Sequence, residues 1–137
     1  KHLSGYRYID IGCGLGQIAA LFSTLNPNAE ISIADAYEQC LIAAEKRIGF
    51  EVKKYIISEH DFDLSEIERE SFDVVVLSHI LEHLMNPVEA LKKVLFILKE
   101  GGIAIVAVPN PSRPMVLFTN IYRKHYVNRG HIYCWDP

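Results

Sequence analysis

The sequence predicts an α/β domain built as a doubly wound, mostly parallel sheet. Short apolar, β-branched runs typical of buried strands alternate with amphipathic helical segments along the chain. A glycine-rich turn follows the first of these runs directly, at the place where doubly wound sheets bind ligands. The chain has 137 residues, half of them apolar, so we expect residues 1–137 to form one domain with its own core.

The first half of the chain contains three predicted strands and two predicted helices. Strands are expected at 6–11, 30–34 and 52–58, and helices at 15–25 and 37–48. The sequence Asn-Pro-Asn at 26–28 ends the first helix, because proline cannot continue a helix. Gly49 is the expected C-cap of the second helix.

The second half adds two strands and two helices to this pattern. Strands are expected at 72–78 and 103–108, a short helix at 64–70 and a longer helix at 87–98. Pro87 suits a helix start, and the glycine pair 101–102 is expected to stop that helix. Five strands separated by helices predict right-handed crossovers, with helices on both faces of the sheet.

The ends of the chain lie close to the predicted sheet. The sequence begins almost at the first strand and stops soon after the fifth. We therefore expect a fold truncated at one or both ends, without an N-terminal helix and the last strands.

Composition indicates a soluble, cytoplasmic protein. No apolar run approaches the roughly 18 residues needed to span a membrane, and no signal-peptide pattern opens the chain. Cys13, Cys40 and Cys134 are odd in number and widely spaced, which fits neither a disulfide framework nor a zinc knuckle. Their usage suits a reducing compartment.

The stretch "YIDIGCGLGQ" combines a glycine turn with an acid. Gly12, Gly14 and Gly16 allow close approach of the backbone to a ligand. The dinucleotide-binding pattern requires a further glycine where this chain has Gln17. Asp10 would repel a pyrophosphate but attract an ammonium group. A nicotinamide-dependent dehydrogenase is therefore disfavoured.

A second acid narrows the choice of ligand. Asp35 ends the second predicted strand, where a carboxylate can accept hydrogen bonds from ribose hydroxyls. A ligand with a ribose, an ammonium group and no phosphate fits both acids and the glycine turn. S-adenosylmethionine is such a ligand.

Several motifs occur together in a characteristic order. They are "YIDIGCGLGQIA", Asp35, "HDFD", "FDVVVLSHILEHLMNP" and "LKEGGIAIVAVPN". From about residue 6 to 110 the chain resembles class I S-adenosylmethionine-dependent methyltransferases, and most closely their small-molecule branch, which includes ubiquinone-type O-methyltransferases. The resemblance implies a Rossmann-like methyltransferase fold and methyl transfer to a small-molecule acceptor.

The resemblance also implies the residues that hold the cofactor. Asp10 and the turn take the methionine end, Asp35 the ribose, and Asp61 the adenine amino group, with Phe62 against the ring. Glu59 or Asp63 could replace Asp61, because "SEHDFDL" offers three acids. The complete predicted cofactor set is Asp10, Gly12, Cys13, Gly14, Gly16, Asp35, Asp61, Phe62 and Ser78.

Two histidines follow the fourth strand, on the expected ligand side. If Ser78 caps a helical turn, then His79, Glu82 and His83 share one face. Glu82 and His83 could be structural, or a histidine could act as a general base, since imidazole titrates near neutrality. The candidate catalytic histidines are His83, His79 and His131, and no metal site is predicted.

Two alternative functions stay open. His79, Glu82 and His83 resemble the Glu-x-x-Glu-His pattern of metal-dependent small-RNA 2′-O-methyltransferases, and "NRGHIYCW" is similar to their later histidine. Histidine stands at 79 where that pattern has glutamate. The second alternative is a non-catalytic, methyltransferase-like domain that binds the cofactor or a partner protein without turnover.

The segment 112–135 is aromatic and basic and contains no acid. Because it follows the fifth strand, we expect it to lie over the acceptor pocket. Its cations favour an acceptor that carries a carboxylate, a phosphate or an acidic hydroxyl. Basic residues with interleaved aromatics also suit nucleic acid, but the net charge of −3 argues against a long nucleic-acid track.

Overall fold

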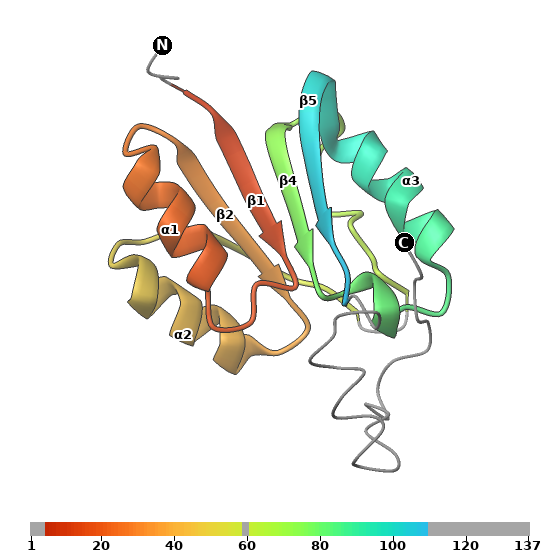
Figure 1. Ribbon diagram of the computed structural model, residues 1–137, viewed down its shortest axis with the longest axis horizontal. Helices are drawn as coiled ribbons and strands as arrows, with labels where there is room; N and C mark the ends of the chain where they lie inside the picture. Colours follow the sequence, from red (N-terminus) through yellow and green to blue (C-terminus); the bar gives the residue numbers. More distant parts are fainter. Residues whose placement is uncertain (1–4, 59–60, 110–137) are drawn as a thin grey trace, which may run out of the picture.

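A five-stranded parallel sheet forms the middle layer of the protein in the computed structural model, which describes residues 5–58 and 61–109 (Figure 1). The strands are β1 (Arg7–Ile11), β2 (Glu30–Asp35), β3 (Lys53–Ile56), β4 (Phe72–Ser78) and β5 (Leu98–Ala107). Their order across the sheet is β3-β2-β1-β4-β5. The chain moves outward from β1 in both directions, so the switch point lies between β1 and β4. The predicted doubly wound fold is confirmed.

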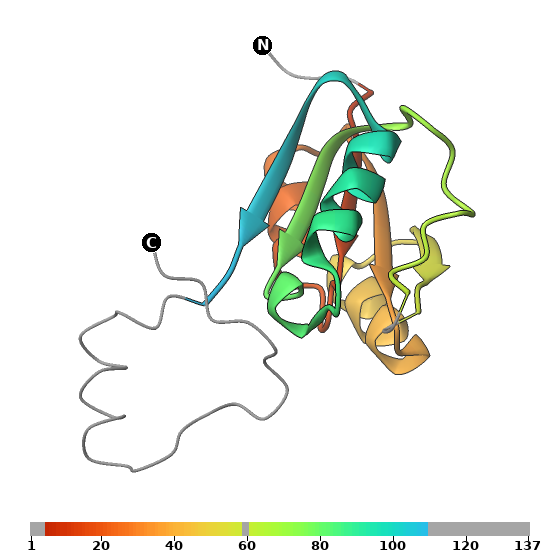
Figure 2. The same cartoon turned by 90° about the vertical axis from the view of Figure 1, so that its right-hand side faces the viewer.

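Helices cover both faces of this sheet. Helices α1 (Gln17–Leu25) and α2 (Glu38–Ile48) lie on one face, and α3 (Pro87–Ile97) lies on the other (Figure 2). A 3₁₀ turn, η1 (Leu81–His83), connects β4 to α3. No helix within 5–58 and 61–109 has the length and apolar character to cross a membrane.

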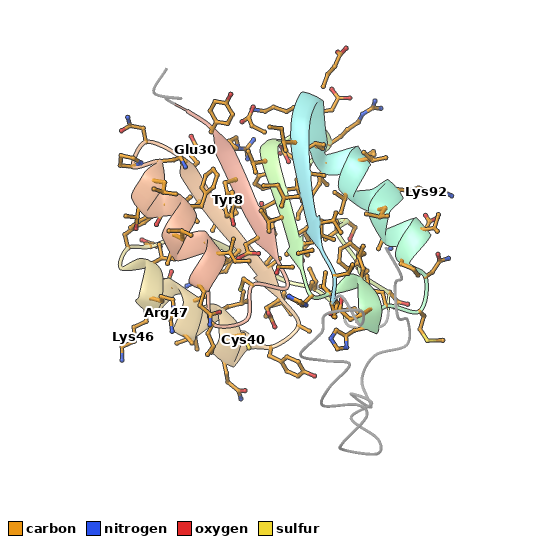
Figure 3. The ribbon with its side chains drawn as sticks, in the orientation of Figure 1. Tyr8, Glu30, Cys40, Lys46, Arg47 and Lys92 are labelled. Atoms are coloured by element: carbon orange, nitrogen blue, oxygen red, sulfur yellow. The ribbon has the colours of Figure 1, made fainter. Side chains whose placement is uncertain are left out.

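The two faces of the sheet carry separate apolar cores, because successive strand side chains point to opposite sides. Tyr8, Val74 and Val76 pack under α1 and α2. Ile9 and Val75 belong to the core on the α3 side. The Tyr8 ring stacks on Phe22 of α1 with 4.0 Å between ring centroids (Figure 3). This stacking anchors α1 over the strand that leads into the glycine turn.

The predicted helix boundaries are confirmed where capping residues set them. Gly49 adopts a left-handed conformation with φ of 89°, and its N–H donates to the Glu45 carbonyl. Pro87 begins α3, and the Asn86 side chain accepts from the Glu89 N–H at 3.1 Å. These local bonds satisfy backbone groups that a helix end leaves free.

The predicted helix at 64–70 is wrong. These residues form a series of turns. Asp63 accepts hydrogen bonds from both the N–H and the hydroxyl of Ser65. Such side-chain bonds compete with helical ones. Leu64 and Ile67 still bury their side chains in the core on the α3 side.

The glycine pair 101–102 does not stop α3. The helix ends at Ile97, and β5 begins at Leu98, directly opposite Phe72. The next pair in the ladder is Val74 with Ile103, so residues 99–102 form an irregularity inside β5. Gly101 has φ of 74°, which a residue with a side chain rarely adopts. The glycines therefore allow a bulge in a strand that starts five residues earlier than predicted.

Candidate functional site

A cavity of about 350 Å³ opens at the carboxyl ends of the central strands. Its wall combines backbone from the glycine turn, a carboxylate, two imidazoles and several apolar side chains. The lining residues are Gly12, Asp35, Ala36, Tyr37, Cys40, Ile57, Ser58, Phe62, His79, Ile80, His83 and Leu84. The mixture suits a ligand with a large apolar part and a few fixed polar groups.

The glycine turn is held against β2 and α2. The N–H groups of Gly12 and Cys13 both donate to the Ala34 carbonyl, at 2.8 and 3.1 Å. Gly16 has φ of 72°, and a Cβ placed there would lie 2.6 Å from the Cβ of Ala44. Gly16 is therefore required both for its backbone angle and for the contact between the turn and α2. Gly12 forms part of the cavity wall.

Asp35 joins the glycine turn to the cavity. Its Oδ2 accepts from the Gly14 N–H at 2.9 Å, and its Oδ1 accepts from the Tyr37 N–H at 3.0 Å. Each carboxylate oxygen can accept a further bond, which a ribose hydroxyl could supply. The Cys40 thiol on α2 is hydrogen-bonded to Asp35, and burial followed by that negative charge raises the pKa of the thiol (Figure 3).

Asp10 lies beneath the turn and not on the cavity wall. Its side chain is 1% exposed, and neither carboxylate oxygen makes a hydrogen bond of ordinary geometry. Burial raises the pKa of Asp10 to about 6; the backbone amide of Ala19 opposes the rise, and the charge of Asp35 adds to it. Near neutral pH the fold therefore holds a buried carboxylate that has neither a cationic partner nor a hydrogen bond of ordinary geometry among the described residues.

The loop after β3 places an aromatic ring in the cavity. Phe62 is 3% exposed, has φ of 44° and lines the cavity. The ammonium of Lys93 on α3 donates to the carbonyls of Asp61 and Phe62 at 2.7 and 3.2 Å. The Asp61 side chain is exposed and is absent from the lining, and Asp63 instead bonds Ser65. Of these two predicted residues, Phe62 therefore lines the cavity and Asp61 does not.

The two predicted histidines after β4 both reach the cavity. Between them lies Glu82, whose side chain has no exposed surface and whose oxygens accept no ordinary hydrogen bond. The Glu82 Oε1 is 3.5 Å from Nδ1 of His79 and 4.0 Å from Nε2 of His83. The three residues do meet, but not through a turn capped by Ser78. Instead His79 has φ of 56°, and η1 begins only at Leu81.

Other predicted residues lie away from the cavity. Ser78 is half-buried at the end of β4 and is absent from the lining. The Cys13 thiol is buried, and burial, with Asp35 adding to it, raises its pKa, so Cys13 contributes backbone and not a nucleophile. His131 and Glu59 lie outside the described residues, as does 112–135. Within 5–58 and 61–109, no group of three His, Cys, Asp or Glu side chains is arranged to hold a metal ion.

Sequence reasoning missed several residues of the cavity wall. Tyr37 caps the start of α2 and Cys40 lies in the first turn of that helix. Ile57 directly follows β3 and precedes the loop that carries Phe62. Ile80 and Leu84 flank the histidine segment. Their positions next to predicted strand ends were the available signal, because the carboxyl ends of parallel strands meet at one edge of the sheet.

Both the sequence and the fold of this chain have counterparts in known proteins. The profile of a family described as "Methyltransferase domain" matches residues 9–104. The chain belongs to the class I S-adenosylmethionine-dependent methyltransferases. This confirms the resemblance seen in the sequence. The family binds S-adenosylmethionine, or S-adenosylhomocysteine after transfer, and the cavity beside Asp35 and Gly12 offers the groups that such a ligand needs.

Individual members of this methyltransferase family match most of the chain. A ubiquinone biosynthesis O-methyltransferase from Rhodopseudomonas palustris (strain BisB18) is 31% identical over 109 residues, covering 79% of this chain and 41% of that protein. The structure of an S-adenosylmethionine-dependent methyltransferase from Mesorhizobium loti has a TM-score of 0.67 at 19% identity, covering 81% of this chain and 50% of that chain.

A third relative shows the family with its reaction product bound. The trans-methyltransferase CalH, in complex with S-adenosylhomocysteine, has a TM-score of 0.64 at 27% identity, covering 74% of this chain and 31% of that chain. The present chain thus spans between 31% and 50% of the length of these three relatives.

Proposed function

We propose that the protein transfers a methyl group from S-adenosylmethionine to a small acceptor. The observation that carries this proposal is the cavity wall, which combines Asp35, the glycine turn and two histidines. The first two suit the ribose and methionine parts of the cofactor. The histidines suit an acceptor that must lose a proton. Bound in this cavity, the cofactor's sulfonium supplies an electrophilic methyl group.

The cofactor is held by residues on three strand ends. The free lone pairs of Asp35 would accept from the ribose hydroxyls. The Phe62 ring lies in the wall, where it would pack against the adenine. Asp10 acts from below the turn, where its buried negative charge attracts the ammonium of the methionine part through a poorly screening interior. Asp61 and Ser78 are assigned weaker roles, since neither lines the cavity.

The protein's part in the transfer is to align the acceptor and to receive its proton. Holding the acceptor atom in line with the methyl group removes most of the entropic barrier to a reaction between two molecules. His79 and His83 lie in the wall with exposed side-chain fractions of 61% and 43%, so an acceptor in the cavity can reach them. A neutral imidazole there can accept the proton of a hydroxyl or amine.

The acceptor itself is proposed to be anionic or acidic. The segment 112–135 carries four arginine or lysine residues and no acid. Cations beside the acceptor would raise its local concentration and favour its deprotonated form. The double variant Arg123→Glu with Lys124→Glu should raise the KM for the acceptor and flatten its dependence on salt, with the affinity for cofactor unchanged. Unchanged acceptor kinetics would reject an anionic acceptor.

The proposed function is tested first by binding and then by turnover. Calorimetric titration of the full-length gene product with S-adenosylhomocysteine should show binding that NAD does not displace. Incubation with radiolabelled S-adenosylmethionine and the small-molecule fraction of a cell extract should then yield a labelled product. Binding without any labelled product would favour the non-catalytic alternative, and no binding would reject both.

A further inference from the structure

The two cavity histidines both face the buried carboxylate of Glu82, but at different distances and through different ring nitrogens. Oε1 of Glu82 lies 3.5 Å from Nδ1 of His79, whereas it lies 4.0 Å from Nε2 of His83. Both Glu82 oxygens are buried without an ordinary hydrogen bond. Burying a carboxylate that has no partner carries a large free-energy cost. A small movement of the His79 ring would satisfy Oε1, and hydrogen bonds in active sites often tighten only when ligands bind.

The backbone of His79 is also unusual. Its φ of 56° is left-handed, a conformation that is unfavourable for a residue with a side chain. The His79 N–H donates to the Ala107 carbonyl at 2.9 Å, which ties this conformation to the end of β5. Strained residues that the surrounding fold enforces are concentrated at functional sites. Here the strain directs the His79 ring to the cavity and to Glu82 together.

We propose that His79 is the general base of the reaction and that Glu82 is the residue that positions it. This inference rests on the proposed methyl transfer and selects one base from its candidates. When Nδ1–H of His79 donates to the Glu82 carboxylate, the ring is fixed in the tautomer whose Nε2 carries a free lone pair. His83 faces the same carboxylate through Nε2 and at the longer distance of 4.0 Å, so Glu82 can orient the ring of His79 more directly than the ring of His83.

The transfer balances with His79 in this role. A lone pair of the acceptor oxygen or nitrogen forms the bond to the methyl carbon, and the electron pair of the broken S–C bond stays on sulfur. The acceptor's proton goes to Nε2 of His79. The imidazolium that results is stabilised by the Glu82 carboxylate, and the proton then passes to solvent, which the half-exposed ring can contact.

The first test reads the tautomer of His79 directly and needs no acceptor. The protein is labelled with ¹⁵N-histidine, and the ring nitrogens are recorded at about pH 8.5, where an ordinary imidazole is neutral. The His79 signals are assigned from their loss in His79→Gln. Wild-type protein should show the proton on Nδ1, and Glu82→Gln should shift the population toward the Nε2–H form. The matched control Glu89→Gln, on an exposed ion pair of α3, should change nothing.

The second test compares the histidines as bases. Methyl incorporation from labelled S-adenosylmethionine into the extract fraction is measured for His79→Gln, His83→Gln and Glu82→Gln. Loss of the base should lower kcat by about 100-fold or more in His79→Gln, leaving the KM for S-adenosylmethionine within about twofold. His83→Gln should lose less than His79→Gln, and Glu82→Gln should lose about 10-fold.

The outcomes separate this inference from the proposed function. A larger loss in His83→Gln than in His79→Gln, or an unchanged His79 tautomer in Glu82→Gln, overturns the assignment while methyl transfer stands. No labelled product from the wild-type protein overturns the proposed function and the base role with it. Binding of S-adenosylhomocysteine will show whether Glu82→Gln folds. If it does not fold, the His79 tautomer in the wild-type protein and the kcat values of His79→Gln and His83→Gln still test whether His79 is the base.

Discussion

The buried carboxylate of Asp10 makes a quantitative prediction about pH and stability. Its pKa rises from an ordinary 3.8 to about 6 in the folded protein, mainly because of burial. At about 1.4 kcal/mol per pH unit, this difference corresponds to about 3 kcal/mol. The folded state binds the proton more tightly than the unfolded state. The favourable contribution of Asp10 is therefore complete below about pH 4, and it is lost as the pH rises through about 6.

Replacing Asp10 by Asn removes this titration. The difference in the free energy of unfolding, variant minus wild type, should increase by about 3 kcal/mol between about pH 4 and pH 7.5. Taking the difference cancels the contributions of other carboxylates, such as Asp73, whose pKa is lowered by its hydrogen bonds from Lys99 and Arg7 despite some burial. The absolute gain at neutral pH will be smaller, because a buried Asn also lacks partners.

The assay is urea unfolding of ligand-free protein at about pH 4, 5, 6 and 7.5, for wild type and Asp10→Asn. Glu51→Gln, a neutralisation on the exposed surface, is the matched control and should give a difference that hardly depends on pH. A pH-independent difference for Asp10→Asn would refute the reasoning that Asp10 is buried without a partner. The same variant should bind S-adenosylhomocysteine more weakly, since the charge that destabilises the empty fold is the one proposed to attract the ammonium.

Three further predictions concern the walls of the cavity. Asp35→Ala should weaken S-adenosylhomocysteine binding by about 1–3 kcal/mol in calorimetry, because the ribose loses its acceptor. Gly16→Ala should destabilise the fold by roughly 2–5 kcal/mol in urea unfolding, because a left-handed angle and a clash with Ala44 add together. Gly49→Ala, with a similar φ but open space, should cost only about 1–2 kcal/mol, and equal losses would contradict the role of that clash. Lys93→Met should loosen the loop that it bonds, lowering cofactor affinity several-fold with about 1 kcal/mol or less of stability lost.

Local chemistry explains which elements the sequence predicted well. The apolar run of β4 and the capping residues Gly49 and Pro87 determine structure only in the few residues around them. Their effects can therefore be predicted from the sequence without knowledge of the fold. The helix expected at 64–70 does not form. The Asp63 carboxylate accepts hydrogen bonds from the N–H and the hydroxyl of Ser65, and such side-chain bonds compete with the backbone bonds of a helix. The start of β5 was missed because pairing of Leu98 with Phe72 is a contact between distant segments.

The sequence by itself indicated the family through the resemblance of its motifs, and it predicted five strands and the three longer helices in their order along the chain. The strands and helices follow from periodicity and residue type. Only the tertiary structure decided that Asp10 is buried while Asp35 lines the cavity, although both are acids at strand ends. Only the tertiary structure, likewise, places the Glu82 carboxylate closer to His79 than to His83. The physical reason is that solvent exclusion and side-chain distance depend on neighbouring strands and helices, whose contacts no local pattern encodes.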